Sequence, residues 1–179
     1  MKRYFYIPVL MMLMLVSCDQ KPTLQKYFVE KAETKDFATL DIAPSFIKTD
    51  KLKLTAEEKS ALESVHKLNV LIFKSRKDNG QAFDTEKAKI KAVLKEDNYD
   101  ELMKMSLGDG GMSINTKGEG EHIEEFVLFL NNKETGMGVV RVLGEDMTPQ
   151  NVMTIVGLLQ KADVDQGALK PLMDIMKKK

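Results

Sequence analysis

The sequence contains a single cysteine, two histidines and no tryptophan among its 179 residues. One thiol, at Cys18, excludes disulfides within the chain, zinc ribbons and a cysteine nucleophile in the folded body that follows it. An excess of positive charge is also missing, because 27 basic side chains balance 27 acidic ones. Such a chain offers phosphate backbones little to bind, so we expect no nucleic-acid partner.

The first 17 residues have the pattern of an export signal. Two basic residues precede an apolar run from Tyr4 to Val16, which is shorter than the roughly 20 residues of a membrane-spanning helix. The run ends in Leu15-Val16-Ser17-Cys18, which looks like a bacterial lipobox. We therefore predict a signal peptide over residues 1–17 and a diacylglycerol thioether on Cys18. Each buried methylene contributes about 0.8 kcal/mol, so two or three acyl chains anchor a protein stably.

This pattern places the mature protein in the bacterial cell envelope, lipid-anchored on the periplasmic face or at the cell surface. Loss of the leader removes two basic residues and leaves a net charge of about −2. Asp19 directly follows the cysteine, and an acidic residue there retains lipoproteins at the inner membrane in some bacteria but not in others. Two other interpretations stay open: an ordinary secretory signal with a cysteine at its boundary, or a short anchor that is never cleaved.

After a lipidated tether over residues 18–22, helices alternate with strands. Residues 22 to 33 have apolar side chains at helical spacing, and 37 to 42 are expected to be extended. Thr55-Ala56-Glu57-Glu58 is a capping box, and the apolar stripe expected behind it is Ala61, Leu62, Val65 and Leu68. Val70 to Phe73 is a continuous apolar run, typical of a strand that is covered on both faces or lies mid-sheet. A further helix is expected over about 84–95.

The second half predicts a four-strand meander followed by two helices. Alternating or dense apolar segments around 103–107, 112–117, 121–130 and 137–143 are joined by glycine-rich or polar turns. Thr148-Pro149 begins one helix, and a last one is expected over about 166–176. We predict a single two-layer α+β domain over residues 23–179, with a mostly antiparallel sheet and helices packed on one face.

Several short segments together resemble a known family. They are the lipobox, Leu40-Asp41-Ile42-Ala43-Pro44, Tyr99-Asp100-Glu101-Leu102-Met103, Glu125-Phe126-Val127-Leu128 and Val142-Leu143-Gly144-Glu145. With them the chain resembles domain of unknown function 4252, a family of small bacterial lipoproteins, from about Leu24 to Leu159. The resemblance implies a single domain and an envelope address. Its motifs are patterns of apolar and turn residues, so it implies no activity and no functional residue.

Candidate catalytic chemistry depends on the two histidines, because a nucleophile needs a base within hydrogen-bonding reach. His66 is expected on the flank of the capped helix, in a structural role. His122 begins a strand beside Glu121, Glu124 and Glu125, and imidazole with carboxylates suits divalent cations. Alternation along a strand points Glu124 and Glu125 to opposite faces, so only part of this set can converge. We therefore predict no catalytic residue, no metal and no cofactor.

Two functions follow. The favoured one is a non-catalytic binding or interaction module, anchored to the membrane, with an envelope protein or a small apolar ligand as its partner. The alternative is a metal-dependent or hydrolytic enzyme that uses His122 and the neighbouring glutamates. Methionines after the leader are expected mainly in the core. Exposure of Met173 and Met176 on the last helix would instead indicate a groove for a partner.

Overall fold

The computed structural model describes residues 21–43, 53–120 and 122–161. Cys18, the leader and the helix expected near 166–176 lie outside this part. The described residues form, in chain order, α2 (Leu24–Ala32), β1 (Phe37–Ile42), α3 (Ala56–Glu63), β2 (Val65–Lys74), α4 (Gly80–Glu96), β3 (Asp100–Leu107), β4 (Gly110–Glu119), β5 (His122–Asn132), β6 (Gly136–Met147) and α5 (Pro149–Lys161).

The strands form one six-stranded sheet in the order β1-β2-β6-β5-β4-β3, and every neighbouring pair is antiparallel. β3 to β6 are the predicted meander, while β1 and β2 extend the sheet beside β6. Gly108, with a φ of 57°, lies in the turn between β3 and β4, where glycine adopts the left-handed conformation without strain. The α+β class and the antiparallel sheet are therefore confirmed.

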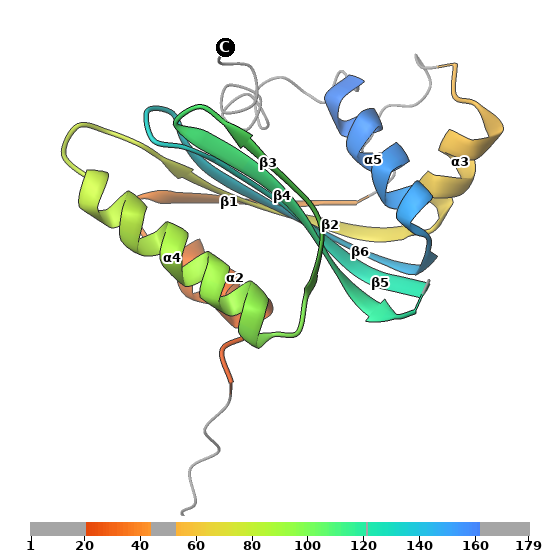
Figure 1. Cartoon of the computed structure of the whole chain (residues 1–179), viewed down its shortest axis with the longest axis horizontal. Coiled ribbons are helices and arrows are strands. Elements are labelled where there is room, and N and C mark those ends of the chain that lie inside the picture. Colours follow the sequence, from red (N-terminus) through yellow and green to blue (C-terminus); the bar gives the residue numbers. More distant parts are fainter. Residues whose placement is uncertain (1–20, 44–52, 121, 162–179) are drawn as a thin grey trace, which may run out of the picture.

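The helices cover both faces of the sheet, so the prediction that they pack on one face is wrong. α2 and α4 lie on one side, and α3 and α5 lie on the other (Figure 1). The long apolar runs explain the difference, because successive residues of a strand point to opposite faces. In β2, Val70 and Ile72 enter one hydrophobic cluster and Leu71 and Phe73 enter the other. The architecture is three-layered rather than two-layered.

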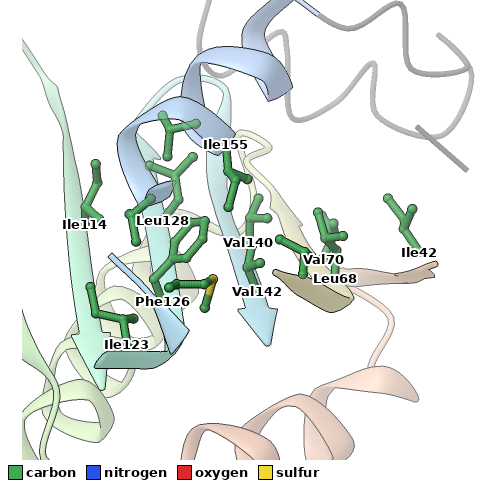
Figure 2. Close-up of a cluster of buried hydrophobic side chains, with 14 of the residues drawn as sticks. Ile42, Leu68, Val70, Ile114, Ile123, Phe126, Leu128, Val140, Val142 and Ile155 are labelled. Atoms are coloured by element: carbon green, nitrogen blue, oxygen red, sulfur yellow. The ribbon is translucent and has the colours of Figure 1, made fainter. Parts of the chain in front are cut away.

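The α3–α5 face holds the larger cluster. Figure 2 shows Ile155 of α5 above Leu128 and Val140, with Phe126 and Val142 beside them. All five side chains are at most 1% exposed. Thr148 receives a hydrogen bond from the amide of Asn151 and so caps α5, which begins at Pro149 as predicted.

The α2–α4 face contains a buried carboxylate that joins its two helices. The Glu86 side chain of α4 accepts hydrogen bonds from Tyr27 Oη at 2.7 Å and from Lys31 Nζ and Lys89 Nζ, both at 2.9 Å. Burial alone would raise the pKa of Glu86, but these hydrogen bonds together lower it below its ordinary value. Burial, with the bond to Glu86, raises the pKa of the Tyr27 phenol. The carboxylate is thus held charged between α2 and α4.

The capped helix is shorter than its apolar stripe indicates. The reciprocal capping box of Thr55 and Glu58 is present, which confirms the start of α3. The helix ends at Glu63, however, and Val65 and Leu68 belong to β2. His66 therefore lies on a strand rather than on a helix flank. The cause is tertiary pairing: Val65 is opposite Gly144 of β6, and Ser64 O accepts a hydrogen bond from Glu145 N at 2.9 Å.

Candidate binding site

A hollow of about 760 Å³ opens at one end of the sheet, between the ends of β2, β4, β5 and β6. Leu143 and Gly144 are its apolar part, and Leu143 follows the core residue Val142, so it points to the face that carries α2 and α4. Both histidines of the chain line the hollow, together with Lys117 and five acidic residues, Glu119, Glu124, Glu125, Glu145 and Asp146. Eight of its ten lining residues therefore have ionisable side chains.

Irregular strand pairing gives the hollow its shape. The register shifts between Val65 and Lys67, between Ile123 and Glu125, and between Lys117 and Gly118. A bulge turns a side chain out of its regular alternation, which places His66 and Glu124 on the lining. Gly118 is required in this arrangement, because a Cβ there would lie 2.1 Å from the carbonyl oxygen of His122.

Two consecutive carboxylates at the end of β6 pair with the two histidines of the flanking strands. His66 Nε2 lies 3.5 Å from Glu145 Oε2, and His122 Nδ1 lies 3.1 Å from Asp146 Oδ1. All four side chains are more than half exposed. Asp146 has a φ of 51°, a left-handed conformation that aspartate tolerates better than most residues. The hollow therefore carries two imidazole–carboxylate pairs on its open side.

A buried ion pair closes the hollow toward the helices. Arg141 of β6 binds Glu125 with two parallel contacts, Nε to Oε1 at 2.6 Å and Nη2 to Oε2 at 2.8 Å. The Tyr99 hydroxyl donates a further hydrogen bond to Glu125. Burial alone would lower the pKa of Arg141, but the contact with Glu125 raises it; burial, with the bond to Glu125, raises that of Tyr99. The arginine thus stays charged and the phenol stays neutral.

Two chains of polar contacts connect this hollow with the beginning of α2. Asp97, the residue after α4, accepts from Leu24 N at 3.0 Å and from Lys117 Nζ at 2.8 Å. Gln25 accepts a hydrogen bond from Arg141, which in turn holds Glu125. Lys117 and Glu125 line the hollow. The first turn of α2 is therefore connected to Lys117 through the side chain of Asp97, and to Glu125 through the side chain of Arg141.

The sequence-predicted residues meet only in part. His122 and Glu124 are exposed on the hollow, whereas Glu125 is buried against Arg141. Glu121 lies outside the described residues. Within the described ranges, no three His, Cys, Asp or Glu side chains are grouped closely enough to hold a metal ion. His66, which we expected in a structural role, shares the hollow with His122.

Sequence reasoning missed Arg141, Lys117, Glu145 and Asp146. A usable signal was present for one of them: Arg141 is the only charged side chain between Gly136 and Leu143, in a strand otherwise fit for the core. An arginine in such a strand is rarely buried without a partner. No comparable signal marks the other three, which are charged residues near strand ends.

The fold and the hollow define a small α+β domain with a charged, irregular sheet end. The chain matches the model of a family described as domain of unknown function (DUF4252) over residues 27–155, and it belongs to this family. No curated protein and no solved structure matches the chain significantly. Among the described helices, none is both long and apolar enough to span a bilayer.

Proposed function

We propose that this protein is a bacterial envelope lipoprotein and that its domain is a non-catalytic binding module with the charged hollow as its site. Diacylglycerol on Cys18 anchors the chain to a bilayer. The observation that carries the proposal is the placement of the hollow: it is joined through Asp97 and Arg141 to the first turn of α2, which begins just after the lipobox cysteine.

The length of the tether limits how far the domain lies from its anchor. Thr23, the N-cap of α2, follows Cys18 by five residues. Five extended residues span at most about 18 Å. The beginning of α2 and the adjoining hollow therefore stay close to the bilayer, where they meet membrane-associated partners rather than proteins at a distance.

Binding is favoured over catalysis because the polar groups of the hollow hold one another in place. The two histidines each face a carboxylate, Lys117 is held by Asp97, and Glu125 is held by Arg141. The carboxylates and cations of the hollow give it charges of both signs, which suit a partner that carries complementary charges. The charged lining favours a polar segment of an envelope protein over a small apolar ligand.

Anchoring is tested by intact-mass and peptide mass spectrometry of the protein purified from its own membranes. We expect residues 1–17 to be absent and Cys18 to carry the mass of diacylglycerol. The control is Cys18→Ala, which we expect to leave the membrane fraction or to retain its leader. A native Cys18 thiol without lipid would contradict the anchoring half of the proposal.

The binding half is tested with charge reversals on the hollow. Cross-linking in envelope extracts identifies proteins held by the wild-type chain, and the same proteins are quantified for Glu119→Lys combined with Glu124→Lys. Glu57→Lys on α3, on the other face, is the matched control. We expect a specific partner to be lost in the double variant and kept in the control. Equal recovery by all three chains would refute the hollow as the site.

The alternative is an enzyme that uses His122 and its neighbouring glutamates. Its support is the placement of His122, Glu124 and Glu125 around one hollow. Elemental analysis of the purified protein, with His122→Ala as the comparison, tests it. A stoichiometric metal that is lost in His122→Ala would favour the enzyme over the binding module.

A further inference from the structure

A second, smaller groove lies between α2 and α4 at the same end of the domain. It encloses about 280 Å³ and is lined in part by Pro22, Tyr27, Ala92 and Val93. Three exposed charged residues, Lys26, Glu30 and Lys89, stand on its lining as well, and Lys89 Nζ also contacts Glu86 Oε1 at 2.9 Å. The groove thus combines an apolar floor with a rim on which two lysines outnumber one glutamate.

The exposed side of α2 also combines lysines with an apolar side chain. Val29, one turn after Lys26, is 63% exposed, the largest exposure among the exposed large hydrophobic side chains of the described residues. Lys21 precedes the groove and is also exposed. A surface of lysines around apolar side chains is the composition that binds at the headgroup level of a bilayer.

Charge therefore differs between the two sides of the α2 start. The groove has two exposed lysines against the one carboxylate of Glu30, while the hollow has one lysine, Lys117, against the exposed carboxylates of Glu119, Glu124, Glu145 and Asp146. Near a bilayer with anionic headgroups, the lysines are attracted and the carboxylates are repelled. The effect falls off over a Debye length of about 8 Å at physiological salt. Only a domain on a short tether responds to it.

We propose that the α2–α4 groove is the surface that rests on an anionic lipid bilayer and thereby turns the hollow toward the aqueous side. Pro22 follows Cys18 by only four residues, which reach at most about 14 Å. This inference rests on the proposed anchoring at Cys18, because without the tether neither side is held within range of the surface. Lys26 and Lys89 contact lipid phosphates, and the exposed Val29 approaches the headgroup boundary.

The test uses the mature chain from residue 18 onward, coupled through its single thiol to a maleimide lipid in vesicles. Chemical coupling makes the result independent of native lipidation, so failure of this inference and failure of the anchoring proposal are distinguishable. Acetylation rates of individual lysines are measured by mass spectrometry in neutral phosphatidylcholine vesicles and in vesicles with about 30% anionic phosphatidylglycerol. Lys59 on α3, also exposed, is the internal reference.

We expect acetylation of Lys26 and Lys89 to slow about threefold or more in anionic vesicles, with Lys59 unchanged. In Lys26→Glu the protection of Lys89 should fall, whereas Lys59→Glu should leave it intact. Raised salt should remove the protection in the wild-type chain. The inference would be overturned if Lys26 and Lys89 were acetylated at the same rates in anionic as in neutral vesicles, or if the protection of Lys89 survived Lys26→Glu.

Discussion

Replacing Arg141 by methionine should destabilise the domain far more than removal of an exposed cation. Methionine keeps the apolar stem but removes the guanidinium that pairs with Glu125. The two side chains of this pair are only 12% and 9% exposed. The variant leaves a buried carboxylate with the Tyr99 hydroxyl as its remaining partner. Breaking a buried pair on one side costs about 3–5 kcal/mol, because the remaining charge stays desolvated.

Urea unfolding of the mature chain measures this loss. With a slope of about 2 kcal/mol per molar urea, a cost of about 4 kcal/mol lowers the midpoint by about 2 M. The matched control is Lys104→Met, which removes a cation 3.4 Å from Glu101 where both side chains are about half exposed. Exposed pairs contribute at most about 1 kcal/mol, so its midpoint should move little.

A double variant separates the ion pair from general packing. Adding Glu125→Leu to Arg141→Met removes the orphaned carboxylate, and the double variant should recover a large part of the lost stability. If Arg141→Met unfolds at the same urea concentration as Lys104→Met, the claim that Glu125 is desolvated by the fold is refuted.

Three further changes probe other parts of the fold. The pKa of Glu86 is lowered in the folded state. The ionised Glu86 therefore stabilises the fold above the unfolded pKa of about 4.3, and this stabilisation is lost as the pH falls below it. Glu86→Gln should flatten this part of the dependence of unfolding free energy on pH, measured by urea titrations at successive pH values. Gly144→Ala places a Cβ 2.3 Å from Ser64 O, and a fall in the thermal midpoint equivalent to about 1–3 kcal/mol is expected. Thr55→Ala removes the hydroxyl that accepts from Glu58 N, and circular dichroism melts should reveal a loss of about 1 kcal/mol.

The elements that local patterns determine could be predicted from the sequence. The capping box at Thr55, the proline that begins α5 and the glycine turn after β3 are each decided by a few neighbouring residues, and all three are present. The meander follows from strands joined by short turns, since such strands usually pair with their neighbours. Local chemistry was sufficient for these features.

The features that long-range contacts determine could not be predicted. Ala61, Leu62, Val65 and Leu68 fit a helical stripe, yet pairing with β6 draws the last two into a strand. The apolar run from Val70 to Phe73 predicted a strand that is covered on both faces or lies in the middle of the sheet. Both descriptions apply to β2, which lies between β1 and β6 and has buried side chains on each face. Periodicity describes a segment, but it does not say which element covers it.

The candidate site was hardest to predict because it depends on irregular pairing. All four register shifts of the described sheet lie at the end where β4 meets β5, and none lies at the end with the β3–β4 and β5–β6 turns. Bulges at that end release side chains such as His66 and Glu124 from regular alternation, so their orientation cannot be counted from the sequence. The same end receives Gln25 at the start of α2 and Asp97 after α4. The two helix ends thus hold Lys117 and Arg141 at the same irregular end of the sheet, through Asp97 and Gln25.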